Sequence, residues 1–284
     1  MSTNSQTNRL LGYPADARLL IINADDFGMC NSVNEAIIGT LKEGVVRSTS
    51  LMAVCPWALQ AINFLKHHPD IPIGVHLTAI SDSINNHWRP LTAAEKVPSL
   101  VDEAGYFYDF EHMPEFMARV RLDQLEMEFR AQIEAVLAAG LEPAHLDWHS
   151  LRIRDRTDIF DVMFGLAREY GLALRVASQS SIEKLQSLGF PTHDHDVLDS
   201  YLLDPINKTA RYAELLRKLA AGLSEWAVHP GLDSAELLAI EPGGTRIRQA
   251  DFDFLTSQQA KEIVKEEEII LLDYRALQKV WKEN

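Results

Sequence analysis

The sequence predicts an α/β fold: a distorted (β/α) barrel of about seven mainly parallel strands, with an inserted loop region. Short apolar segments alternate with longer amphipathic ones along most of the 284 residues, as strands and helices do in a parallel sheet. The apolar segments are nearly continuous, which is typical of strands buried on both faces. No repeat or linker stands out. We therefore expect one domain over residues 19–284, preceded by a loose N-terminal arm over residues 1–18.

The first part of the chain supplies three strands and two helices. The strands are expected at 19–23, 48–54 and 71–77, and the helices at 32–43 and 56–67. Gly44 marks the end of the first helix, because glycine adopts the backbone conformations that stop helices. Residues 81–114 break the pattern with three prolines, several aromatic residues and little periodicity. They predict an insertion that packs over a site.

The rest of the chain returns to alternating strands and helices. Gly140 and Gly171 end two amphipathic segments, and Thr256 or Ser257 offers an N-cap for a later one. Residues 180–210 show no clear pattern. Strands are expected at 144–147, 172–177, 225–229 and 269–272, and helices at 122–139, 156–170, 210–221, 256–267 and 274–281.

The composition favours a cytoplasmic protein that acts on a small molecule. The formal net charge is −14 and the pI about 5.1, so nucleic acid and anionic membranes are unfavourable partners. No apolar run approaches the roughly 18 residues of a membrane span, and the first residues carry no apolar leader segment. Two cysteines, Cys30 and Cys55, are more typical of reduced thiols than of a disulfide framework.

Histidine and aspartate residues gather at the ends of four predicted strands. In parallel α/β folds, ligands bind at the carboxyl ends of the strands. We therefore expect these residues to meet at one rim of the barrel. They are Asp25 and Asp26, His76, the segment His145-Leu-Asp147-Trp148-His149, and His229.

The adjacent carboxylates of Asp25 and Asp26 indicate a cation site. Two negative charges held close together are unfavourable without a positive partner. A metal ion resolves this, because one carboxylate binds it while the other stays free to accept a proton. The alternative is that the pair caps the following helix.

The histidines extend the same hypothesis. His145, Asp147 and His149 share one face at strand spacing, unless the chain turns near Trp148. Histidine with aspartate is a usual ligand set for a divalent ion such as zinc, and Mg²⁺ is an alternative ion for this site. A lone histidine inside a strand, such as His76, is alternatively a hydrogen-bonded core residue. His229 before Pro230 is a weak signal by itself.

One aspartate and two histidines would leave metal positions open for water and a carbonyl oxygen. With a carboxylate as base and a histidine as acid, this set is suited to amide or ester hydrolysis. Other enzyme classes lack support. There is no glycine-rich nucleotide loop and no Gly-x-Ser-x-Gly motif. A glycosidase pair such as Asp25 and Asp147 would leave the histidines unexplained.

Four motifs resemble those of the YdjC-like carbohydrate deacetylases, which include chitooligosaccharide and hopanoid-biosynthesis deacetylases. The similarity runs in order from about residue 19 to residue 274. The motifs are Asn-Ala-Asp-Asp-Phe-Gly at 23–28, Ile-Gly-Val-His-Leu-Thr at 73–78, His-Leu-Asp-Trp-His at 145–149 and His-Pro-Gly at 229–231.

The resemblance implies a distorted barrel, a small N-acetylated carbohydrate as substrate, and a homodimer by family habit. It implies zinc or magnesium held by Asp26, His76 and His149. Asp25 would be the general base, His229 the acid or oxyanion partner, and Arg175 a residue near the site. Trp148 departs from the family, where serine is frequent and further histidines follow; it is either a sugar-stacking platform or part of the core. Remaining alternatives are an amidase or esterase for a non-sugar substrate and a catalytically silent sugar-binding protein.

Overall fold

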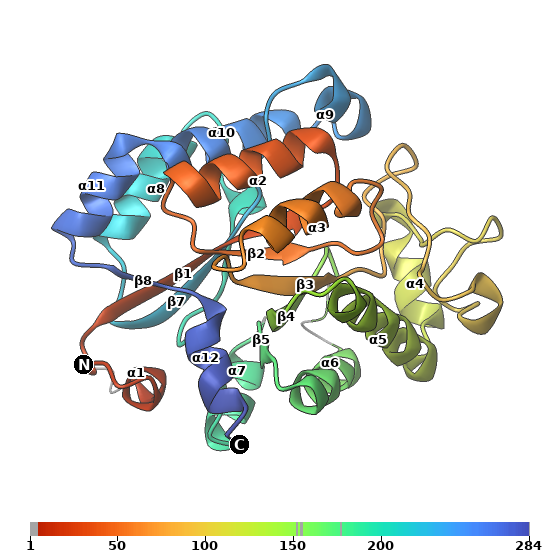
Figure 1. Ribbon diagram of the computed structural model, residues 1–284, viewed down its shortest axis with the longest axis horizontal. Coiled ribbons are helices and arrows are strands. Elements are labelled where there is room, and N and C mark those ends of the chain that lie inside the picture. Colours follow the sequence, from red (N-terminus) through yellow and green to blue (C-terminus); the bar gives the residue numbers. More distant parts are fainter. Residues whose placement is uncertain (1–4, 152, 154–155, 177, 284) are drawn as a thin grey trace.

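In a computed structural model, the chain forms a parallel sheet curled into an open barrel, with helices around its outside (Figure 1). The structure describes residues 5–151, 153, 156–176 and 178–283. Seven strands follow one path in the order β5-β4-β3-β2-β1-β7-β6, and β8 lies beside β1. The predicted α/β class and barrel-like parallel sheet are thus confirmed. The strands are β1 (Arg18–Phe27), β2 (Ser48–Leu51), β3 (Ile73–Leu77), β4 (Pro143–Trp148), β5 (Ala173–Leu174), β6 (Leu198–Asp199), β7 (Gly222–Val228) and β8 (Ile270–Leu272).

Strand β1 is the centre of the sheet and carries the first candidate residues. Its first seven residues pair with all of β7, from Arg18 with Gly222 to Ala24 with Val228. On its other side, β8 pairs with the first half and β2 with the second half. Every residue after Arg18 in β1 is buried. Asp25 and Asp26 therefore emerge at the carboxyl end of the most deeply packed strand.

All seven predicted helices are present, and five further helices were not predicted. The unpredicted helices are α1 (Gln6–Leu10), α4 (Met113–Arg119), α7 (Gln179–Ser187), α9 (Ala235–Ile240) and α10 (Thr245–Thr256). The buried side of α10 includes Thr245, Arg248 and Asp251, so its apolar periodicity is too weak to detect. The helices are α1 (Gln6–Leu10), α2 (Asn31–Glu43), α3 (Ala58–His67), α4 (Met113–Arg119), α5 (Leu122–Ala138), α6 (Thr157–Tyr170), α7 (Gln179–Ser187), α8 (Lys208–Arg217), α9 (Ala235–Ile240), α10 (Thr245–Thr256), α11 (Gln258–Glu266) and α12 (Tyr274–Trp281), with 3₁₀ turns η1 (Ala94–Lys96), η2 (Phe110–His112) and η3 (Ser200–Leu202).

The N-terminal segment differs from the predicted loose arm. Residues 6–10 form α1, and residues 1–4 of the arm lie outside the described part of the chain. The Ser5 hydroxyl donates to Asp194 at 2.7 Å, and the buried Thr7 hydroxyl donates to the Thr192 carbonyl at 2.6 Å. These partners are remote in sequence, so no local pattern could have revealed the docking.

The insertion is fastened to the barrel by polar side chains one turn apart on α5. Gln124 accepts a hydrogen bond from the Ser99 N–H, and the buried Glu128 carboxylate accepts from the N–H groups of Leu91 and Thr92. Aromatic residues of the insertion also face inward: Trp88 is only 3% exposed and Phe107 fully buried. The insertion is therefore a fixed cover, as the sequence predicted.

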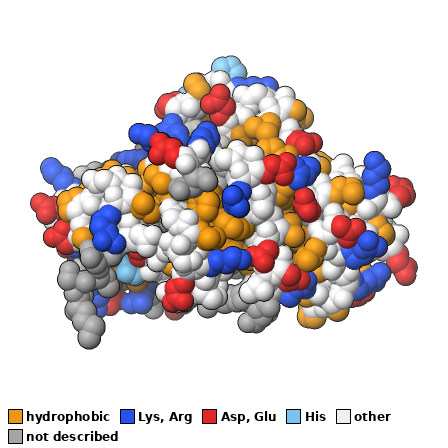
Figure 2. Space-filling model, turned by 90° about the horizontal axis from the view of Figure 1, so that it is seen from below, with side chains coloured by type: hydrophobic (Ala, Val, Ile, Leu, Met, Phe, Trp, Pro, Cys, Tyr) orange, Lys and Arg blue, Asp and Glu red, His pale blue; other side chains and the backbone are white. Residues whose placement is uncertain are grey.

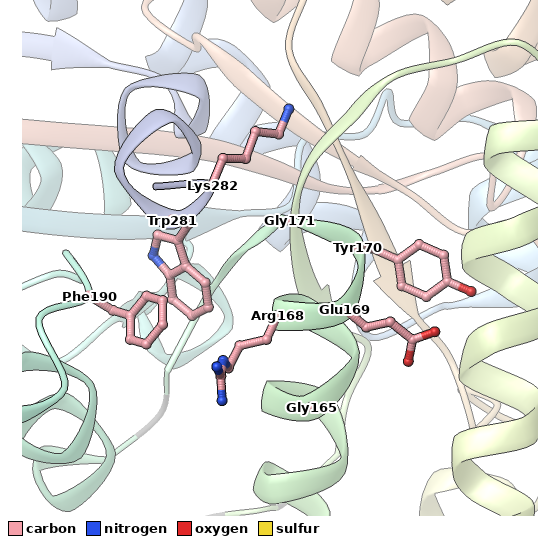
Figure 3. Close-up of a pocket in the computed structure, with 8 residues that line it drawn as sticks. All are labelled: Gly165, Arg168, Glu169, Tyr170, Gly171, Phe190, Trp281 and Lys282. Carbon is pink, nitrogen blue, oxygen red and sulfur yellow. The ribbon is translucent and has the colours of Figure 1, made fainter. Parts of the chain in front are cut away.

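A surface pocket lies apart from the strand ends that carry the candidate residues. Acidic and basic side chains are interspersed with hydrophobic ones on the face in Figure 2. A pocket of about 660 Å³ lies between the end of α6, Phe190 and the end of α12 at Trp281 (Figure 3). The end of α6 leads into the amino end of β5, opposite the carboxyl ends. None of the described helices is long and apolar enough to cross a membrane.

Candidate metal centre and active site

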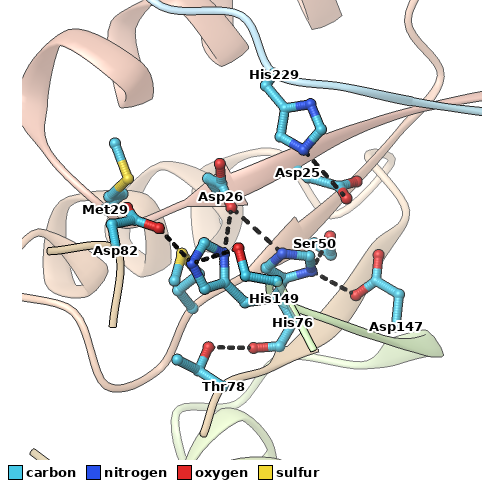
Figure 4. A network of polar contacts seen from close by, with 12 residues as sticks. Asp25, Asp26, Met29, Ser50, His76, Thr78, Asp82, Asp147, His149 and His229 are labelled. Atoms are coloured by element: carbon cyan, nitrogen blue, oxygen red, sulfur yellow. Dashed lines mark hydrogen bonds and ion pairs between the residues drawn. The ribbon is translucent and has the colours of Figure 1, made fainter. Parts of the chain in front are cut away.

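Three predicted metal ligands meet at the carboxyl ends of their strands (Figure 4). Asp26 Oδ1 lies 3.0 Å from His149 Nδ1 and 3.3 Å from His76 Nε2. One atom from each residue falls within a 4.8 Å cluster, and all three side chains are buried. Asp26 has a positive φ of 70°, which turns the chain out of the extended geometry that would separate neighbouring side chains. This cluster therefore joins residues from β1, β3 and the end of β4.

Each member of this cluster is held from behind by a charged group. His76 Nδ1–H donates to Asp147 at 2.9 Å, and His149 Nε2–H donates to Asp82 at 2.7 Å. This leaves His76 Nε2 and His149 Nδ1 directed at Asp26. A carboxylate behind a histidine fixes its tautomer and orientation in metal sites.

Arg248 holds the other side of Asp26. Its guanidinium donates to Asp26 Oδ2 at 2.8 Å and to Glu241 at 2.7 Å. Although burial opposes ionisation, Arg248 and the two histidines keep the pKa of Asp26 well below its usual range. Asp26 is therefore anionic at neutral pH, as a metal ligand would need to be.

The two histidines carry raised pKa values. Burial lowers the pKa of His76, but Asp147 and Asp26 outweigh it and raise the value to about 9. Burial also opposes the charge on His149, whereas Asp82 and Asp26 raise its pKa to about 10. In the metal-free protein both rings would be protonated near pH 7.

The charge balance fits a divalent ion. Even with both histidines protonated, six negative charges face four positive ones. A divalent ion could replace the two protons and restore the same charge, and metal binding requires deprotonated histidines. The carboxylates belong to Asp25, Asp26, Asp82, Asp147, Glu225 and Glu241, and the guanidinium groups to Arg175 and Arg248.

The thermal stability of the metal-free protein should fall as pH rises from about 6.5 to about 10. The folded-state pKa values of His76 and His149 exceed the ordinary value of 6.5. Their protonation therefore stabilises the fold fully below pH 6.5, and this contribution is lost as pH rises through about 9 and about 10. The melting temperature of chelator-treated protein, followed by circular dichroism, measures the effect. A double variant, His76→Gln with His149→Gln, should show a shallower decline; parallel declines would contradict the prediction.

A second acidic cluster already contains its cation. Asp25, His76 and Asp147 also come within 4.8 Å, but Arg175 reaches this place. Its guanidinium bonds to Asp25 at 2.6 and 2.9 Å and lies 3.1 Å from Asp147. Glu225 accepts its third bond at 2.6 Å. The Asp26 cluster is therefore the better place for a metal ion, and Asp25 is left as a fixed carboxylate beside it.

His229 lies on the other side of Asp25. It follows β7, the neighbour of β1, and its Nε2 is 3.9 Å from Asp25 Oδ2 (Figure 4). Its side chain keeps 13% of its surface exposed. A carboxylate and an imidazole thus flank one point next to the candidate metal ligands.

The remaining predicted residues take structural positions. His145 faces the barrel interior, 3.5 Å from Asp147, and stacks on Tyr274 with ring centroids 3.7 Å apart. A side chain at Gly74 would collide with the His145 ring, so this glycine makes room for it. Trp148 is half-buried against the core, and its indole donates to the Leu151 carbonyl. Of the two interpretations of Trp148, core packing is the one these contacts favour.

Two charged residues that contact the candidate metal ligands were not found from the sequence. Asp82 lies in the insertion, where no periodicity marks it, and its contact with His149 depends on the fold. Arg248 lies on α10, a helix that the sequence pattern missed. The only available signal was the residue type, and it is weak, because charged residues are common on any protein surface.

Comparison with known proteins identifies the family. A family model described as "YdjC-like protein" matches residues 19–266. The chain belongs to this family. The resemblance noted in the four motifs is thereby confirmed.

Relatives of this YdjC-like protein match it over nearly their whole length. A protein of Enterococcus faecalis named "Carbohydrate deacetylase" is 34% identical, covering 91% of this chain and 97% of the relative. One of the same name from Thermoanaerobacter pseudethanolicus is 29% identical over 92% and 99%. The crystal structure of an Enterococcus faecalis protein, described as a "putative cellobiose-phosphate cleavage protein", superposes with a TM-score of 0.80 at 34% identity. It covers 92% of this chain and 99% of that chain.

Proposed function

We propose that this protein is a metal-dependent hydrolase that removes the N-acetyl group from an amino sugar or short oligosaccharide. The observation that carries the proposal is the juxtaposition of three buried candidate ligands, Asp26, His76 and His149, with the carboxylate–imidazole pair of Asp25 and His229. The names of relatives such as the Enterococcus faecalis protein support a carbohydrate deacetylase. The donor set of two nitrogens and one carboxylate favours zinc over magnesium.

The residues divide the reaction between them. When bound at Asp26, His76 and His149, a divalent ion would polarise the acetyl carbonyl and lower the pKa of a nearby water molecule. Asp25 accepts the proton of the attacking water, and Arg175 with Asn23 holds its carboxylate still. His229 Nε2 donates a proton to the amine nitrogen as the carbon–nitrogen bond breaks. The products are acetate and a free amino sugar.

Acetate release should require a divalent ion. Protein stripped with chelator is incubated with short N-acetylglucosamine oligomers, and zinc, magnesium, manganese or cobalt is added in turn. We expect activity to return with at least one ion, and most strongly with zinc. His149→Ala should show neither activity nor stoichiometric metal binding, because it removes a ligand.

The other outcomes separate the alternatives. Metal binding without acetate release would reject the sugar substrate and direct the search to amides or esters of other kinds. Sugar binding by the metal-free protein, with no turnover under any ion, would support a silent binding protein instead. Full activity in the presence of excess chelator would contradict the metal requirement.

A further inference from the structure

His229 is connected to a buried carboxylate through a serine hydroxyl. Ser200 Oγ lies 2.8 Å from His229 Nδ1 and 2.6 Å from Asp251 Oδ2. Ser200 is on η3 and Asp251 on α10, and both are fully buried. Three segments remote in sequence therefore converge on one ring nitrogen.

The acceptors around Asp251 decide the direction of each hydrogen bond. Asp251 Oδ2 also accepts from the His229 backbone N–H at 2.9 Å. Its Oδ1 accepts from the Tyr212 hydroxyl at 2.7 Å and pairs with the buried Lys208 ammonium at 2.6 Å. An ionised carboxylate only accepts, so the Ser200 proton is committed to Asp251. The Ser200 oxygen is then left to accept, and His229 Nδ1 must be the donor.

Other charged groups near His229 are less well placed for this role. Asp199 Oδ1 is 3.9 Å from Nδ1, and its side chain is 49% exposed. Asp25 lies on the opposite side, near Nε2. The Tyr201 ring meets the imidazole edge to face at 4.7 Å between centroids. Ser200 is thus the nearest acceptor for Nδ1–H.

We propose that Ser200 is a positioning residue for His229, holding the Nδ1–H tautomer so that Nε2 faces Asp25 and the candidate metal ligands. Lys208 and Tyr212 keep Asp251 in place as the anchor of this relay. The proposal rests on the proposed function insofar as it concerns turnover. The hydrogen bonds run from His229 to Ser200 and from Ser200 to Asp251, so a neutral hydroxyl lies between the imidazole and the buried carboxylate.

The consequence for catalysis follows from the tautomer. After His229 gives its Nε2 proton to the leaving amine, the neutral ring must keep its proton on Nδ1. Without Ser200, the neutral ring can instead carry its proton on Nε2 and bond to Asp25. That form engages the base and presents no free Nε2 lone pair for a new proton, so turnover falls while substrate binding is retained.

Nitrogen-15 NMR of the metal-loaded, histidine-labelled protein reads the tautomer directly, with His229→Gln used to assign the signals. Because Asp199 could replace the lost acceptor, and asparagine would keep an accepting oxygen there, the comparison is D199A against D199A/S200A. We expect Nδ1–H in the wild type and D199A, and a shift toward Nε2–H in the double variant. S200T, which keeps a hydroxyl, should restore the wild-type signal. Ser48→Ala, which removes another buried hydroxyl on β2, should leave it unchanged.

Acetate release is measured on the same proteins. Loss of the Ser200 hydroxyl should lower kcat by about tenfold to a hundredfold at unchanged KM, a part of the about 10²–10⁴ that a positioned acid supplies. The proposal is overturned if neutral wild-type His229 carries its proton on Nε2, or if D199A/S200A keeps both the tautomer and the kcat of D199A. If the wild type releases no acetate, the proposed function fails, and the tautomer comparison still decides the positioning.

Discussion

Asp25→Asn should lower kcat for acetate release by about 10²–10⁴-fold and leave bound metal unchanged. The amide has the size of the carboxylate but accepts no proton from water. Asp25 Oδ2 is the oxygen near His229 Nε2, whereas the metal ligand is proposed to be Asp26. The substitution should thus separate proton transfer from metal binding. Acetate release and metal content are measured on the same purified sample.

A matched substitution controls for the general effect of losing one carboxylate. Asp273→Asn alters a residue that caps α12 through the Arg275 N–H, far from the site in sequence. Asparagine is also a good N-cap, so its kcat should equal that of the wild type. Asp25→Asn protein that keeps a tenth or more of the activity would exclude Asp25 as the base. Loss of metal along with activity would assign Asp25 to the ligand set instead.

Arg175→Met should destabilise the fold by about 3–5 kcal/mol. The arginine is buried and faces three buried carboxylates, those of Asp25, Asp147 and Glu225. Methionine replaces its volume but leaves these charges unpaired in a region of low polarity. The free energy of unfolding in urea, or the soluble fraction if the variant does not fold, measures the effect.

Arg130→Met is the matched control on the surface. Arg130 pairs with Glu126 at 3.0 Å and with Glu169, and all three side chains are substantially exposed. Exposed pairs contribute only about 0–1 kcal/mol, because water screens them. A urea midpoint for Arg175→Met equal to that of Arg130→Met would show that the buried carboxylates are neutral or separately compensated.

The fold class and the meeting of the candidate metal ligands could be predicted because their signals are local. A buried parallel strand leaves a continuous apolar run, and residues at its carboxyl end reach the rim of the sheet whatever the rest of the chain does. Asp26, His76 and His149 lie close together because they follow this rule, on β1, β3 and the end of β4. Helices with clear apolar faces, such as α12, were predicted to the residue.

The errors occurred where packing uses polar residues. α10 was missed because its inward side carries Arg248 and Asp251, which have partners on other elements. The N-terminal segment was expected to be loose, yet its hydroxyl groups bond to Asp194 and Thr192. A polar residue is buried only if a distant partner satisfies it, and the partner is not visible in the local sequence.

The sequence by itself thus determined a parallel α/β barrel and the histidines and aspartates at its rim. Only the tertiary structure decided how these groups are charged and aimed. Asp82, Arg175 and Arg248 set the charge around the candidate ligands, and Ser200 with Asp251 holds His229 in hydrogen bonds. These contacts join segments far apart along the chain, and both pKa and tautomer depend on distances of a few ångströms. Strand order can be inferred from a pattern, but those distances are fixed only when the whole chain has packed.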